Sequence, residues 1–205
     1  MRYTTFLVIP AEYALMDREP IPSTELYRVA DALNAIGIET CFVEGATGFL
    51  DGVRIVNGAL HVSPDARVSD LLHEAGHLAI LPRRYRHLAN DDLDDLVREM
   101  FETAEREGLE SESPLYRALL QCSDTEATAW AWAFGRHLGL APETIIEDHQ
   151  YPDEDGNGSG AEVRLQVSMG MYLGVNGLAH AGFCSTNRLG RRPQYPKLAF
   201  WTQEL

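Results

Sequence analysis

The sequence has few cysteines, few basic residues and no long apolar run. Its three cysteines, Cys41, Cys122 and Cys184, form no Cys-x-x-Cys pair, which is typical of reduced, mostly buried thiols. The 17 Lys and Arg against 31 Asp and Glu give a net charge of −14, which argues against non-specific nucleic-acid binding. The apolar run Phe6–Ile9 is too short for a signal peptide or a membrane span. We therefore expect a cytoplasmic protein with neither a nucleic-acid nor a membrane partner.

The composition is that of an ordinary globular protein, with 45% apolar and 23% charged residues in 205. We expect one domain with an α+β fold, in which a small antiparallel N-terminal sheet packs on a helical bundle. Residues 1–62 are expected to form mainly the sheet and one helix, and residues 63–145 the helices of a candidate metal site. Residues 146–205 are expected to form an acidic loop and a helical, relatively basic tail.

Short patterns predict the elements around this site. Tyr3–Ile9 and Ile38–Val43 read as strands, and Asn57-Gly58 between Val53–Val56 and Leu60–Val62 predicts a β-hairpin. Ser63-Pro64 predicts the start of the next helix, which Pro82 ends, and Asn90 is expected to cap a third one. Further helices are expected near Leu115–Leu120 and from Ser123 to Leu138.

The segment His73-Glu74-Ala75-Gly76-His77 reads H-E-x-x-H within the helical stretch Val68–Ile80. Spacing of four residues puts both imidazoles on one face of a helix, where they can share a metal ion. The apolar residues of the stretch gather on the other side, so one face can pack while the other presents ligands. Glu74 would then act on a water molecule rather than on the metal.

A zinc peptidase site needs a third protein ligand and one open position for water. The extended motif with a third histidine is excluded, because its Gly and His positions are occupied by Ile80 and Arg83. A carboxylate on a later helix is the remaining common solution, and Glu126 is the preferred candidate.

Alternatives to Glu126 remain open at this point. Ser123-Asp-Thr-Glu126 is also a capping-box pattern, in which Glu126 would bond back to the Ser123 amide. Asp124 and Glu99 are weaker candidates for the third ligand, and either would otherwise be an ordinary surface charge.

Two segments resemble the ImmA/IrrE-like metallopeptidases. The run from Thr125 to Ile145 looks like the signature E-x-x-A-x-x-F-A-x-x-L-L-x-P, and Leu165–Ala179 resembles a later helix of that family. The resemblance implies Zn²⁺ held by His73, His77 and Glu126. It also implies hydrolysis of a peptide bond in a protein partner such as a transcriptional repressor.

In the mechanism that this resemblance implies, Glu74 is the general base that takes a proton from water and passes it to the leaving amine. An oxyanion stabiliser should complete the site. The candidates are Tyr85, His149, His180 and Tyr195, and the sequence does not choose among them.

Two other interpretations compete with this one. The protein could be a non-enzymatic regulator with a vestigial or structural zinc site, for which Cys122 would be the fourth ligand to examine. Asp153–Gly158 matches the first half of a calcium-binding EF-hand loop, but Arg164 occupies the position of the bidentate Glu. The pattern therefore favours an acidic surface loop over a Ca²⁺ site.

Overall fold

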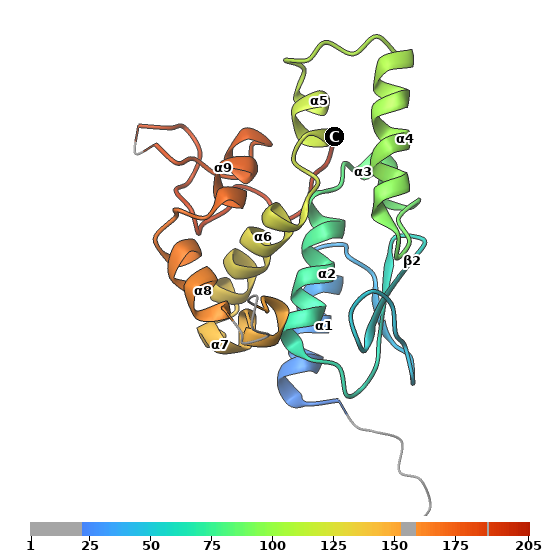
Figure 1. Cartoon of the computed structure of the whole chain (residues 1–205), viewed down its shortest axis with the longest axis vertical. Helices are drawn as coiled ribbons and strands as arrows, with labels where there is room; N and C mark the ends of the chain where they lie inside the picture. Colours follow the sequence, from blue (N-terminus) through green and yellow to red (C-terminus); the bar gives the residue numbers. More distant parts are fainter. Residues whose placement is uncertain (1–21, 153–158, 188) are drawn as a thin grey trace, which may run out of the picture.

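The computed structural model describes residues 22–152, 159–187 and 189–205, and it confirms an α+β fold (Figure 1). The elements, in chain order, are α1 (Thr24–Ala35), β1 (Thr40–Phe42), β2 (Val53–Val56), β3 (Ala59–Val62), α2 (Val68–Ile80), α3 (Arg83–Arg86), α4 (Leu93–Arg106), α5 (Pro114–Leu119), α6 (Asp124–His137), α7 (Pro142–Ile145), the 3₁₀ helix η2 (Asp148–Gln150), α8 (Gly160–Ser168) and α9 (Leu173–His180). None of these helices is long and apolar enough to cross a membrane. The strand expected at Tyr3–Ile9 and the acidic loop at Asp153–Gly158 lie outside the described residues.

The sheet has three strands in the order β1-β3-β2 and is mixed rather than wholly antiparallel. β2 and β3 form the predicted antiparallel hairpin, in which Asn57 and Gly58 both have positive φ, as the favoured two-residue hairpin turn requires. β1 pairs in parallel with β3. β1 pairs with β3 rather than with β2, its neighbour in the sequence. Because the hairpin makes β2 and β3 antiparallel, β3 is the strand that runs in the same direction as β1.

α2 is the central helix of the core, and its Leu71, Leu72 and Leu78 side chains are fully buried. The helix begins at Val68 rather than at the predicted Ser63-Pro64. Ser63 instead donates its hydroxyl hydrogen bond to Asp65, within a turn that precedes the helix. The N-cap of α4 is likewise Asp92, two residues after the expected Asn90, and the Asp92 side chain accepts a hydrogen bond from the Asp94 amide.

α6 packs along α2, and Figure 1 shows the two side by side between the sheet and the group α7–α9. Their backbones approach closely at Gly76, where an added Cβ would lie 2.5 Å from the carbonyl oxygen of Ala127. On its other side, α6 contacts α9, where an added Cβ on Gly174 would overlap the Thr125 carbonyl. The first turn of α6 is therefore fixed from two sides by glycine contacts.

Candidate metal centre

His73, His77 and Asp124 form a group that could hold a metal ion. The two imidazole Nε2 atoms lie 3.2 Å apart. The Asp124 Oδ1 atom lies 3.1 Å from the Nε2 of His77 and 3.6 Å from that of His73. Two histidines of α2 and the first residue of α6 thus aim three ligand atoms at one point.

These spacings match what tetrahedral coordination needs. Metal–ligand bonds of about 2.0–2.1 Å place neighbouring ligand atoms roughly 3.3 Å apart. The three separations, 3.1, 3.2 and 3.6 Å, lie around this value. Two imidazole nitrogens and one carboxylate oxygen are also a donor set that suits a divalent transition metal. The residues present therefore fit a metal ion.

The group lies at the surface and has an open side. The Asp124 side chain is 84% exposed, whereas those of His73 and His77 are 17% and 13% exposed. Among the described residues the group has three members. The Cys122 thiol contacts the carbonyls of Ala118 and Ile80, and burial raises its pKa to about 12. Cys122 therefore does not join this group as a fourth ligand.

The pKa values of the two carboxylates at the site, Asp124 and Glu74, are shifted in opposite directions. The close contacts with the His73 and His77 imidazoles hold the pKa of Asp124 far below its usual range, so this group stays ionised. Burial raises the pKa of Glu74, and the neighbouring His77 and His73 only partly oppose this effect. Within the described part of the chain no hydrogen bond to the Glu74 carboxylate is found. Glu74 is thus a buried, basic carboxylate beside the histidines, as a general base needs to be.

Glu126, the predicted third ligand, lies elsewhere, and Asp124 is the carboxylate that meets the histidines. The Glu126 carboxylate accepts hydrogen bonds from the hydroxyls of Ser123 and Thr125, the latter at 3.0 Å. It is buried against α9, where an added Cβ on Gly177 would overlap its Oε1. The capping box that the sequence also suggested is not formed. The Ser123 hydroxyl donates to the Glu126 carboxylate, and the Ser123 side chain caps no backbone amide of α6.

The other weaker candidate, Glu99, lies in α4 and is not part of the group.

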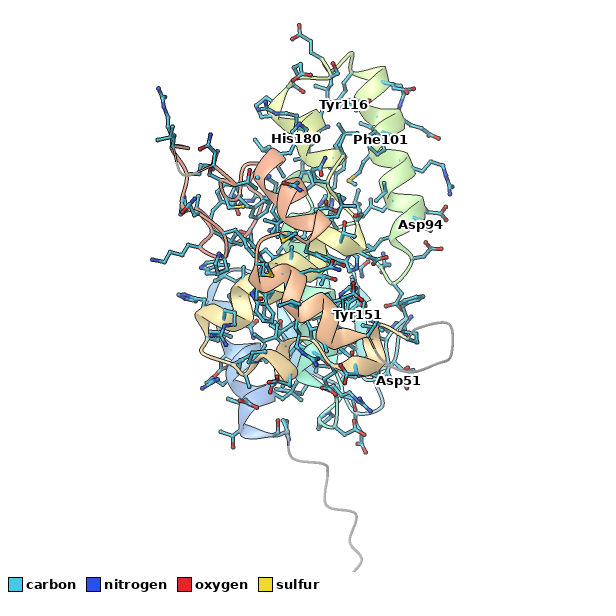
Figure 2. All side chains as sticks on the ribbon, turned by 60° about the vertical axis from the view of Figure 1, so that its left-hand side comes forward. Asp51, Asp94, Phe101, Tyr116, Tyr151 and His180 are labelled. Atoms are coloured by element: carbon cyan, nitrogen blue, oxygen red, sulfur yellow. The ribbon has the colours of Figure 1, made fainter. Side chains whose placement is uncertain are left out.

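Two of the four proposed oxyanion stabilisers are engaged in other contacts. The Tyr195 hydroxyl donates to the Ala129 carbonyl at 2.9 Å, and burial raises its pKa well above the usual value. The His180 Nδ1 lies 3.3 Å from the Gln121 amide nitrogen, near the end of α9 (Figure 2).

The other two belong to other parts of the fold. The His149 ring bridges Asp70, at 3.1 Å from Nε2, and Arg67, at 3.0 Å from Nδ1, so it ties η2 to the start of α2. The Tyr85 hydroxyl is buried and has no partner among the described residues, and the charges that act on it are those of Arg84, of Glu107 and of two residues of α4. The structure thus assigns none of the four to the group around Asp124.

A cluster of hydroxyls near Asp124 was not anticipated from the sequence. Thr128, one turn after Asp124 on α6, lies 2.6 Å from the Tyr151 hydroxyl and also lies near the Tyr172 hydroxyl. Burial chiefly raises the pKa of both tyrosines, and the nearby charge of Asp124 raises it further. The four-residue spacing from Asp124 could have indicated Thr128. Tyr151 is the C-cap residue of η2 and Tyr172 is the N-cap residue of α9, so neither belongs to a periodic pattern that would mark it.

The chain matches no protein-family model, no curated protein and no solved structure. Its fold and site together define an α+β protein with a surface His-His-Asp group able to hold a metal ion.

Proposed function

We propose that this protein is a zinc-dependent metallopeptidase whose ligands are His73, His77 and Asp124. The observation that carries the proposal is the convergence of three ligand atoms at tetrahedral spacing beside a buried glutamate. Three ligands with an open side are typical of a catalytic zinc site, whereas a structural site is closed by a fourth. The choice of a peptide bond as the substrate comes from the H-E-x-x-H pattern.

The metal ligands and Glu74 would have different roles in hydrolysis. Zinc bound by this group would supply a Lewis acid that acidifies water and polarises a carbonyl. Glu74 would accept the proton of the attacking water and deliver it to the leaving amine. Burial raises the pKa of Glu74, which makes its carboxylate a stronger base for the first of these transfers.

The tyrosine hydroxyls are the groups that we assign to the oxyanion. Tyr151 and Tyr172 meet at Thr128 and lie near the ligand Asp124. A hydroxyl with a raised pKa stays protonated at neutral pH, so it can donate a hydrogen bond to the oxygen that gains charge in the transition state.

Glu74→Gln is the direct test of the proposed function. The amide keeps the size of the side chain but cannot accept the proton, so hydrolysis should fall about 10²- to 10⁴-fold while bound zinc stays equimolar. The measurements are fluorescein-labelled casein hydrolysis and metal content by mass spectrometry. Glu99→Gln on α4 is the matched control and should keep full activity. Equal activity of the Glu74→Gln and wild-type proteins would refute the mechanism, as would zinc-loaded wild-type protein that hydrolyses no polypeptide.

Tyr151→Phe and Tyr172→Phe test the assignment of the oxyanion donor. Loss of the acting hydroxyl should lower kcat about 100-fold with little change in KM or zinc content, because the bond forms only in the transition state. Tyr195→Phe is the control, since its hydroxyl bonds the Ala129 carbonyl in the core; it should lower thermal stability but not kcat. Unchanged kcat in both test variants would exclude this role.

A further inference from the structure

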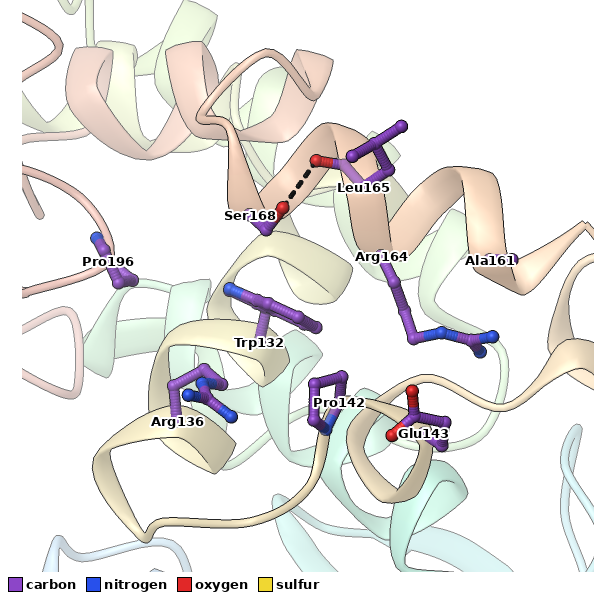
Figure 3. A pocket seen from close by; sticks show the side chains of 9 residues that line it. All are labelled: Trp132, Arg136, Pro142, Glu143, Ala161, Arg164, Leu165, Ser168 and Pro196. Carbon is purple, nitrogen blue, oxygen red and sulfur yellow. Dashed lines mark hydrogen bonds between the residues drawn. The ribbon is translucent and has the colours of Figure 1, made fainter.

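Exposed apolar side chains gather where α8 ends and α9 begins. Leu165, Met169, Met171 and Leu173 are 59%, 61%, 69% and 68% exposed, and Leu165 also lines the pocket drawn in Figure 3. They are four of the eleven large apolar residues that are exposed in the described chain, and they fall within nine consecutive residues. Isolated exposed apolar residues are normal on protein surfaces, but such a concentration marks an interaction site.

This segment also lacks charge. From Val167 to Ala179 the sequence contains no Asp, Glu, Lys or Arg, although 23% of the chain is charged. An apolar partner therefore meets no charged group of the segment that it would have to desolvate. The two methionines are flexible and polarizable, which suits a surface that accepts different apolar side chains.

The apolar turn lies beside the candidate metal centre. Tyr172, in the middle of the turn, has its hydroxyl near Thr128 and Asp124 of α6. Two residues on, Gly174 packs directly against the Thr125 backbone, next to Asp124. Figure 2 turns α8 and α9 to the front, where they cover α6. The turn thus leads directly into the part of α9 that packs on the first turn of α6, which carries Asp124.

We propose that the turn Met169–Leu173 is the docking surface for apolar side chains of the polypeptide substrate, next to the bond that is cut. The inference rests on the proposed function and deepens it by naming a substrate class, extended segments rich in Leu, Ile, Met or Phe. A substrate polypeptide is the proposed binding partner because the turn lies close to the metal group. A polypeptide whose scissile bond lies at the metal must run across adjacent surface, and this adjacent surface is apolar and uncharged.

The test measures peptide binding without turnover. The zinc-loaded Glu74→Gln protein is titrated into a fluorescein-labelled twelve-residue peptide with four leucines, and into the same peptide with serines in their place. Fluorescence anisotropy should show binding of the leucine peptide at least about tenfold tighter. Adding Met171→Gln and Leu173→Gln should remove at least about tenfold of that affinity, because two side chains lose their apolar contact. Leu189→Gln, at a position that is 91% exposed, is the matched control and should leave the affinity unchanged.

The outcomes separate this inference from the proposed function. If the leucine peptide binds no tighter than the serine peptide, or if the double variant binds it equally well, the docking surface is refuted. If sedimentation shows a dimer that the double variant loses, the turn is instead a contact between copies of this chain, and the inference is also overturned. If the leucine peptide binds as expected but wild-type protein hydrolyses no polypeptide, the docking surface stands and the peptidase function fails.

Discussion

Asp124→Asn is expected to lower the affinity for Zn²⁺ by at least about 100-fold and to abolish hydrolysis. The Asp124 carboxylate would supply one of three ligand atoms, and it lies 3.1 Å from the His77 nitrogen and 3.6 Å from that of His73. Loss of an outer hydrogen-bond partner of a metal ligand already costs about 10- to 100-fold, and loss of a ligand should cost more. Competition with a chromophoric chelator measures the affinity. The side chain is 84% exposed, so its replacement should leave the fold intact.

Glu126→Gln is the matched control for this experiment. It removes one negative charge from the same helical turn, so it changes the net charge and the field at the start of α6 by nearly the same amount. Its zinc affinity should change less than about threefold. The variant should instead lower the melting temperature, because the buried carboxylate holds the Ser123 and Thr125 hydroxyls. If Glu126→Gln lost the metal and Asp124→Asn kept it, the ligand set derived from the geometry would be wrong.

Gly76→Ala is expected to lower the free energy of unfolding by about 2 kcal/mol and to weaken metal binding. The new methyl group would lie 2.5 Å from the Ala127 carbonyl oxygen and 2.9 Å from its carbonyl carbon, both backbone atoms. Overpacking costs about 1–3 kcal/mol or more, and the better helix propensity of Ala returns only about 1 kcal/mol. Because Asp124 is one turn before Ala127, a displacement of α6 also moves a ligand away from the histidines. Denaturant unfolding and zinc competition measure the two effects.

Gly135→Ala is the control that separates the steric effect of the added Cβ from the gain in helix propensity. It is also a helical glycine, but its added Cβ would meet the side chain of Ile145, which can move, rather than a backbone. The variant gains the same propensity and lies far along α6 from Asp124. It should be more stable than Gly76→Ala and bind zinc as the wild type does. Equal zinc binding by all three proteins would show that the close approach of α2 and α6 does not position the ligands.

The parts of the site that local periodicity determines were predictable from the sequence. His73 and His77 share a helical face because they are four residues apart, and the helix ends just before Pro82 as predicted, although it begins at Val68 rather than at Ser63-Pro64. The hairpin followed from Asn57-Gly58, since few residues tolerate positive φ at both turn positions.

The choice between Asp124 and Glu126 could not be made this way. Two residues apart on a helix, the side chains point about 200° from each other, so only one can face α2. The rotation of α6 about its axis decides which one, and contacts between distant segments set that rotation. Gly76 meets Ala127 on one side, and Gly174 meets Thr125 on the other. A single sequence shows where such glycines occur but not what they touch.

The strand order and the tyrosine cluster depend on similar long-range contacts. The parallel pairing of β1 with β3 follows from which strand returns beside it. Tyr151 reaches Thr128 because His149 and Gln150 are anchored on Asp70 of α2. Neither the strand order nor the tyrosine cluster produces a periodic pattern in the sequence.

The packing of α2 against α6 through Gly76 also means that metal binding should affect the stability of the fold. The ligands come from two helices that are joined through the long excursion of α3, α4 and α5. A metal ion held by both helices therefore acts as a cross-link that closes this large loop, and it opposes local opening at the exposed first turn of α6. Binding free energy becomes folding free energy, about 2.7 kcal/mol when free metal is 100-fold above its dissociation constant. A protein that holds a metal ion at this group should therefore unfold less readily than the metal-free protein.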